Sequence, residues 1–164
     1  MKKLALISLI SVLLLVGGCG PKEKPDAEMA AAGDPAESAA PAAEPDRIEV
    51  QHILVSFQGA ISKDSVTRTR EEAEALAQEI LMTVRSGENF DAMVKQHTDD
   101  EYPGIYRMAN NGVEPDRDNR EYPRGGMVKA FGDVSFSLEV DGIGMTEYDP
   151  ETSKYGWHII KRLK

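Results

Sequence analysis

The sequence predicts an α+β fold for residues 47–164, and three observations support this prediction. Apolar residues with β-type patterning fill residues 48–55, near the start of this region, and residues 155–163 at its end. Two segments between them repeat apolar residues at helical spacing. The resulting order of strand, helices, loop, short helix and strands is typical of an α+β domain.

Each of the two terminal strands contains one histidine, His52 in the first and His158 in the last. An imidazole that is removed from water needs a polar partner, because an unpaired one costs on the order of 1–3 kcal/mol. If the two strands lie side by side, each histidine can satisfy the other. The alternative is that each is a half-exposed strand residue.

The longer helix is predicted to begin after Thr69, because Thr69 and Glu72 have the spacing of a capping box. Its apolar stripe consists of Ala73, Leu76, Ala77, Ile80, Leu81 and Val84. Gly87 then ends the helix. A shorter helix is expected from about Asn89. Its buried face consists of Phe90, Met93 and Val94.

The C-terminal half of this region carries weaker patterns. Residues 101–116 are expected to form a long loop. Residues 127–131 predict a short helix that leads into residues 134–138 and the final strands. Residues 47–164 are enough for one ordinary domain with one core.

The first 18 residues have the pattern of a secretory signal peptide. Lys2 and Lys3 precede an apolar run at residues 4–16 that is too short to span a bilayer. Small residues then lead to Cys19, the only cysteine, in a pattern that resembles the lipobox of bacterial lipoproteins. The resemblance implies cleavage before Cys19 and lipid attachment to its sulfur. A structural thiol is the alternative.

Residues 19–46 are predicted to be a lipidated cysteine followed by a disordered linker. The linker is rich in Ala, Pro, Glu and Asp and has no aromatic residue, so it cannot bury enough apolar surface to offset the entropy of ordering. Flexible-chain scaling gives it an r.m.s. reach of roughly 30 Å. We therefore expect a domain in the cell envelope, anchored by lipid to a membrane and facing outside the cytoplasm. In a cell with two membranes, Gly20 after the cysteine favours the periplasmic face of the outer membrane.

The charge of the chain excludes two classes of partner. The formal net charge is −9, and loss of Lys2 and Lys3 with the signal peptide makes the remainder more acidic. A negative surface repels nucleic acid and anionic lipid headgroups. We expect neither as a partner, and contact with the membrane only through the lipid on Cys19.

Several motifs, in their order along the chain, resemble the parvulin (PpiC-type rotamase) family of peptidyl-prolyl cis/trans isomerases. They are residues 50–55, 69–73, 87–94, 124–127, Phe131, 134–138 and 155–160. The resemblance implies a four-stranded antiparallel sheet surrounded by about four helices. It also implies isomerisation of X-Pro bonds in exported polypeptides, without a cofactor. A chaperone or peptide-binding (holdase) module that lacks catalysis is the alternative on the same fold.

The resemblance assigns four catalytic positions. His52 and His158 match the paired histidines at the floor of the family's site. Asp100 falls where the family has cysteine or aspartate facing the substrate bond, and the alternative is a solvated loop carboxylate. Ser153 occupies a position that threonine often holds.

The resemblance also assigns the substrate pocket, where this sequence matches the family pattern less well. Met127 and Phe131 match residues that line the proline pocket, and ordinary core packing is their alternative. Many family members carry a Gly-Gly-Asp-Leu-Gly-x-Phe segment, whereas residues 117–122 here read Arg-Asp-Asn-Arg-Glu-Tyr. Asn119 would then replace the pocket leucine, and Tyr122 the phenylalanine.

Other chemistries find little support. The three histidines, His52, His97 and His158, lack the spacing of metal ligands, so no metal is expected. Residues 116–121 begin like a calcium loop but have no glycine at the sixth position. Between residues 57 and 66 the only basic residue is Lys63, which argues against a phosphate-binding site.

Overall fold

The computed structural model describes residues 43–164. The predicted signal peptide, Cys19 and most of the predicted linker therefore lie outside the described part of the chain. No helix within residues 43–164 combines the length and apolar character needed to cross a bilayer.

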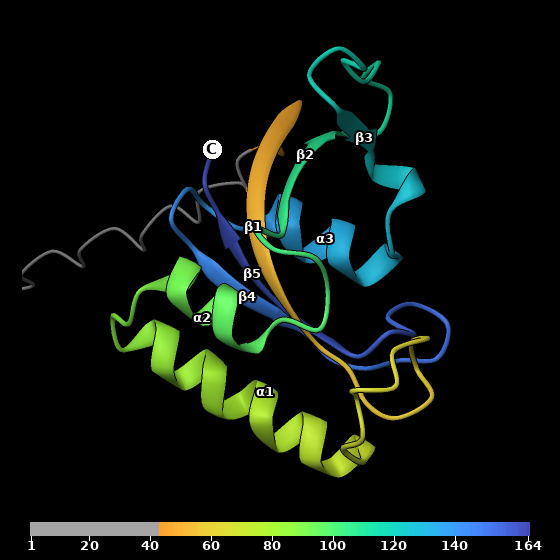
Figure 1. Cartoon of the computed structure of the whole chain (residues 1–164). Helices are drawn as coiled ribbons and strands as arrows, with labels where there is room; N and C mark the ends of the chain where they lie inside the picture. The colour runs from red at the N-terminus through yellow and green to blue at the C-terminus, as the bar shows by residue number, and fades with distance from the viewer. Residues whose placement is uncertain (1–42) are drawn as a thin grey trace, which may run out of the picture. The chain divides into compact units, whose positions relative to one another are not determined.

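A five-stranded sheet forms the centre of the domain (Figure 1). Its strands are β1 (Arg47–Val55), β2 (Ile105–Ala109), β3 (Glu121–Pro123), β4 (Ile143–Thr146) and β5 (Trp157–Arg162). The order across the sheet is β3-β2-β1-β5-β4, so the first and last strands of the chain are neighbours at its centre. All pairs are antiparallel except β2 with β3, which is parallel.

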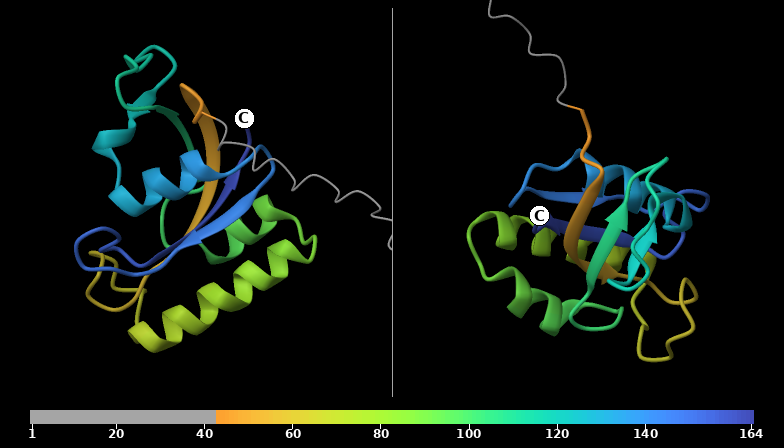
Figure 2. Two further views of the ribbon diagram at one scale, coloured as in Figure 1. Left: turned by 180° about the vertical axis from the view of Figure 1, so that it is seen from behind. Right: turned by 90° about the horizontal axis from the view of Figure 1, so that it is seen from above.

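Helices cover both faces of this sheet (Figure 2). They are α1 (Arg70–Arg85), α2 (Phe90–His97) and α3 (Lys129–Ser137), with a short 3-10 turn at Arg124–Gly126 before α3. Apolar residues of α1 and α2 pack on one face of β1 and β5, around Ile53 and Ile159. Residues of α3 pack on the other face, around Val50 and Ile160. Because successive strand residues point to opposite faces, one pair of central strands serves two apolar clusters.

Short-range sequence signals determine where the helices α1 and α2 begin. The Thr69 hydroxyl accepts a hydrogen bond from the backbone N–H of Glu72, and the Glu72 carboxylate accepts one from the N–H of Thr69. This capping box was predicted and is confirmed. Asn89 caps α2 in a similar way, through the N–H of Ala92 at 2.9 Å. Gly87 follows α1 with a φ of 106°, a conformation that favours glycine.

The α+β fold class is confirmed, and the structure adds detail that the sequence did not predict. The segment 101–116, expected to be a loop, contains β2. Residues 134–137, expected to follow the short helix, continue α3 through Ser137. The sheet has one strand more than the four expected, because three residues of β3 pair in parallel with the end of β2.

The contacts of the domain begin before Arg47, where the sequence placed its boundary. The Glu44 carboxylate forms an ion pair with Arg124. Asn110 donates a hydrogen bond to the carbonyl of Pro45 at 3.0 Å, and its N–H bonds the carbonyl of Asp46 at 2.8 Å. The last residues of the predicted linker are therefore held against the domain.

Candidate active site

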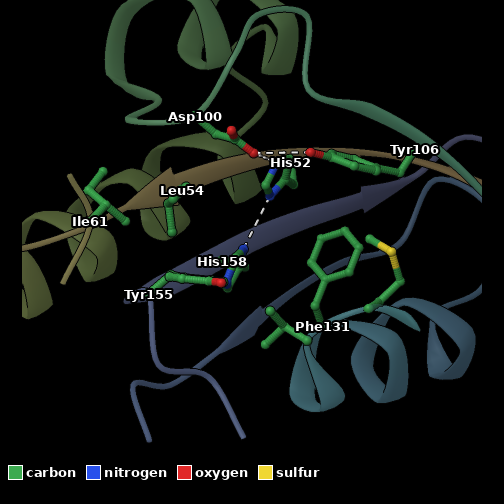
Figure 3. Close-up of a pocket in the computed structure, with 10 residues that line it drawn as sticks. His52, Leu54, Ile61, Asp100, Tyr106, Phe131, Tyr155 and His158 are labelled. Atoms are coloured by element: carbon green, nitrogen blue, oxygen red, sulfur yellow. Dashed lines mark hydrogen bonds and ion pairs between the residues drawn. The ribbon is translucent and has the colours of Figure 1, made fainter. Parts of the chain in front are cut away.

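A pocket of about 290 Å³ opens on the α3 side of the sheet (Figure 3). It is lined by His52, Leu54, Ile61, Asp100, Tyr106, Met127, Val128, Phe131, Tyr155 and His158. These residues come from β1, β2, β5, α3 and the loops between them. The pocket thus gathers five of the eight residues to which the sequence assigned a catalytic or substrate-binding role.

The two histidines form a direct contact at the floor of the pocket. Their Nδ1 atoms lie 3.2 Å apart, and their rings are nearly parallel with centroids 5.4 Å apart. His52 pairs with Ile160 across β1 and β5, while His158 pairs with Leu54, so both rings point to the same face from diagonal positions. His52 is 2% exposed and His158 is 5% exposed. The predicted contact is confirmed, and the half-exposed alternative is wrong.

Asp100 connects this pair to the rim of the pocket. Its Oδ2 accepts a hydrogen bond from His52 Nε2 at 3.1 Å and another from the Tyr106 hydroxyl at 3.1 Å. The hydrogen bond from His52 is the main cause that lowers the pKa of Asp100 to about 2. Burial raises the pKa of Tyr106 to about 12, with the Asp100 charge acting in the same direction. At neutral pH the site therefore holds an ionised carboxylate and a protonated phenol.

This arrangement fixes the direction of the hydrogen bonds when both histidines are neutral. The Nε2 of His52 faces Asp100, an acceptor, and so carries the proton. The Nδ1 of His52 then accepts from the Nδ1–H of His158. Burial, followed by the proximity of His52, lowers the pKa of His158 to about 3, so this ring stays neutral. Its Nε2 has no hydrogen-bond partner within residues 43–164.

The apolar wall of the pocket is built mainly by Phe131. Its ring meets those of His52 and His158 edge-on, with centroids 5.1 and 5.4 Å away. Phe131 also belongs to the apolar cluster beneath α3, and Met127 packs against that cluster. Phe131 and Met127 therefore both pack in the core and line the pocket, the two roles that the sequence had left as alternatives.

Ser153 lies behind the pocket rather than in it. Its hydroxyl donates to the carbonyl of Gly156 at 2.9 Å and lies 3.2 Å from the hydroxyl of Thr146. The Thr146 hydroxyl in turn accepts the backbone N–H of His158 at 3.1 Å. Ser153 is fully buried, and its contact with Thr146 connects it to the backbone of His158.

Asn119 and Tyr122 lie outside the pocket, contrary to the expectation from the sequence. The Asn119 side chain donates to the Asp116 carboxylate at 2.7 Å, within its own loop. Tyr122 is 49% exposed, and its ring packs beside that of Tyr106, with centroids 5.7 Å apart. Tyr106 is the side chain of this region that lines the pocket. The expectation failed because β2 lies in the segment that was taken for a loop.

Sequence reasoning missed half of the lining. The residues that it did not assign are Leu54, Ile61, Tyr106, Val128 and Tyr155. Leu54 and Tyr155 lie inside motifs that had been recognised. Leu54 is two residues from His52, so strand alternation places Leu54 and His52 on the same face of the sheet. No local pattern marks Tyr106 or Ile61. Within residues 43–164, no group of three or more His, Cys, Asp or Glu side chains is arranged to hold a metal ion.

Comparison with known proteins agrees with this geometry. Residues 38–164 match the sequence profile described as the PPIC-type PPIASE domain. Foldase protein PrsA 4 of Bacillus cereus is 34% identical over 115 residues, which cover 70% of this chain and 31% of the foldase. Chaperone SurA of Chromohalobacter salexigens is 29% identical over 112 residues, covering 68% of this chain and 21% of the chaperone. The chain thus spans about a third or less of these relatives.

Solved structures share the fold. The solution structure of TbPIN1 aligns with a TM-score of 0.54 at 24% identity, over 73% of this chain and 98% of TbPIN1. Peptidyl-prolyl isomerase ESS1 from Candida albicans aligns with a TM-score of 0.53 at 20% identity, over 73% of this chain and 63% of the isomerase. At these identities the likeness shows a common architecture.

Proposed function

This chain belongs to the family of PPIC-type PPIASE domains, and we propose that it accelerates cis/trans isomerisation of X-Pro bonds in exported polypeptides. The observation that supports this most directly is the arrangement of the pocket. An apolar wall at Phe131 stands beside a hydrogen-bonded chain from His158 through His52 to Asp100. A pyrrolidine ring fits the apolar side, and the peptide bond before it then lies near the polar side.

Isomerisation needs only rotation about one bond. The barrier is about 18–20 kcal/mol because the planar amide has C–N double-bond character. Twisting the amide shifts electron density from the carbonyl oxygen back to nitrogen, and water that hydrogen-bonds the oxygen favours the planar form. A pocket that excludes this water and holds fixed charges around the bond lowers the barrier.

In this proposal each group has a distinct role. Phe131 and Met127 hold the proline ring, whereas the Asp100 carboxylate borders the carbonyl oxygen, whose negative charge decreases as the bond twists. A fixed anion at that position repels the planar state more than the twisted state. His52 and Tyr106 keep the Asp100 carboxylate in place, since both donate to Oδ2, and His158 supports His52 from behind.

A coupled isomerisation assay on the purified protein tests the proposal. Tetrapeptides that differ only in the residue before proline should all convert faster than without protein, and to different extents. Binding of these peptides is measured in parallel. If the protein binds them and gives no acceleration with any peptide, the catalytic proposal is wrong and the holdase function takes its place.

The second candidate, a folding-assistance module that binds extended segments without catalysis, has support from two sources. The curated relatives carry the names foldase and chaperone. The chain also differs from the family pattern quoted above, because no residue of the segment 117–122 lines the pocket, whereas Tyr106 contributes a hydroxyl to its wall. The ratio of turnover to binding in the same assay separates the two candidates.

We also propose that the domain works in the cell envelope, held to a membrane by lipid on Cys19. Support comes from the sequence of residues 1–19. Its clients would then be proline-containing segments of exported chains near that membrane. Membrane fractionation and mass spectrometry of the N-terminal fragment test this part independently of the isomerase assay.

A further inference from the structure

A second cavity adjoins the pocket and contains exposed aromatic side chains. It has a volume of about 440 Å³ and is lined by residues 101–107 together with Arg120 and Tyr122. Three large side chains here are unusually open to solvent: Tyr102 is 52% exposed, Tyr122 49% and Ile105 42%. Large apolar side chains that gather in one exposed hollow indicate a contact surface.

The cavity and the candidate active site share one lining residue. Tyr106 lines both hollows. Its ring lies 5.7 Å from the Tyr122 ring on the outer side and 5.2 Å from the His52 ring on the inner side, measured between centroids. A run of aromatic rings thus leads from the surface at Tyr122 to the floor of the pocket.

The backbone beside this cavity is an open strand edge. The N–H of His52 donates to the carbonyl of Gly104 at 3.0 Å, so Gly104 faces β1. By the alternation of an antiparallel ladder, the N–H and C=O of Ile105 face away from β1. β3 pairs with β2 only from Arg107 onward, so within residues 43–164 no strand lies beside Ile105. An extended peptide can add to such an edge.

We propose that this cavity, named here the tyrosine groove, holds the part of a client chain next to its bound proline and favours an aromatic side chain there. The inference rests on the proposed function, because the proline must occupy the neighbouring pocket. One extended chain would pair with the edge at Ile105 and stack a ring on Tyr122, at the outer end of the run of aromatic rings. The chemistry that it recognises is therefore a proline with an aromatic residue nearby.

The charges around the groove agree with an apolar occupant. Its charged lining residues are Arg107, Arg120 and Glu101. Arg107 is already paired with the Glu49 carboxylate at 2.7 Å. The groove thus has no strong net charge with which to select a phosphorylated or acidic segment, and its tyrosines supply the preference.

Peptide binding to the purified protein provides the test. One series carries phenylalanine two residues before or two residues after the proline. Each residue of an extended chain advances about 3.4 Å, so two residues span more than the 5.7 Å between the Tyr106 and Tyr122 rings. The matched series has alanine at the same positions. We expect the better phenylalanine peptide to bind about threefold to tenfold more tightly, the scale of one aromatic pair. N-methylation of the peptide amide that faces Ile105 should reduce this gain.

Protein variants assign the preference to the groove. Tyr122→Ala should bring the ratio of phenylalanine to alanine affinities close to one. Met82→Ala, which alters an exposed apolar side chain on α1 that does not line the groove, should leave the ratio unchanged. The peptide series on the unaltered protein keeps the test valid if Tyr122→Ala does not fold.

The outcomes distinguish this inference from the proposed function. If both peptide series are isomerised with equal affinity, the tyrosine groove is wrong and the isomerase proposal remains. If the preference exists but survives Tyr122→Ala, the aromatic residue binds elsewhere and the inference is also wrong. If no proline peptide is isomerised but phenylalanine peptides bind through Tyr122, the groove is supported and the catalytic proposal is wrong.

Discussion

Acidification from pH 7 to pH 4.5 should destabilise this domain through His158. Burial, with a further contribution from His52, lowers the pKa of this ring to about 3 from its ordinary value of 6.5. In the unfolded chain the ring gains a proton near pH 6.5, whereas in the folded domain it stays neutral down to about pH 3. Over this interval the unfolded state binds more protons, so the free energy of unfolding decreases as the pH decreases.

The size of the effect follows from the width of that interval. Each pH unit over which the two states differ by one proton changes the free energy of unfolding by about 1.4 kcal/mol. Between pH 6.5 and pH 4.5 the loss is therefore about 2–3 kcal/mol, a large part of the roughly 5–15 kcal/mol that stabilises an ordinary domain. Asp100 contributes little between pH 6.5 and pH 4.5. Its pKa is lowered in the folded domain, so the stability that it adds is lost only at pH values below about 4.

Urea unfolding at pH 7.0, 5.5 and 4.5 measures this effect, with the buried Trp157 as the fluorescent probe because it is the only tryptophan. His158→Phe should lose about 1–3 kcal/mol at pH 7, since it leaves the His52 Nδ1 without a partner. The same variant should lose less additional stability on acidification than the unaltered protein. His97→Gln, at the end of α2, is the control and should keep the full pH dependence. Equal losses in His158→Phe and the unaltered protein would refute the reasoning.

Three further predictions address the pocket and the anchor. Phe131→Ala should weaken binding of proline peptides by about 1–3 kcal/mol, the scale of one buried apolar side chain. Phe136→Ala, which is equally buried in the same cluster but does not line the pocket, should reduce stability without this loss of binding. Asp100→Ala should lower kcat while changing peptide affinity less, because the carboxylate acts mainly on the twisted state, and unchanged turnover would contradict its role. Cys19→Ala should leave an uncleaved precursor or a released domain in membrane fractionation, and a processed, lipidated and membrane-bound variant would contradict the anchor.

The parts of the fold that could be predicted from the sequence are those whose signals lie close together in the chain. The capping box at Thr69 needs only residues within one helical turn, and the helix that it begins was predicted with its buried stripe. The contact between His52 and His158 joins residues 106 positions apart. It was still predictable, because each histidine stands in a strongly β-patterned segment and each needs a polar partner.

The residues that were misplaced depend on a strand pairing with no comparable signal. The segment 105–109 is only five residues long and mixes exposed and buried positions. Its β structure therefore depends on pairing with β1, more than 50 residues earlier in the chain. With that strand unrecognised, the expected pocket residue was Asn119, whereas Tyr106 of β2 lines the pocket and Asn119 does not. The difference matters chemically, because Tyr106 supplies Asp100 with a side-chain donor in addition to His52. The first residue of the same strand, Ile105, also has no strand beside it on the side away from β1 within residues 43–164, so the element that was hardest to predict would, in the two proposals above, relate catalysis to the choice of client.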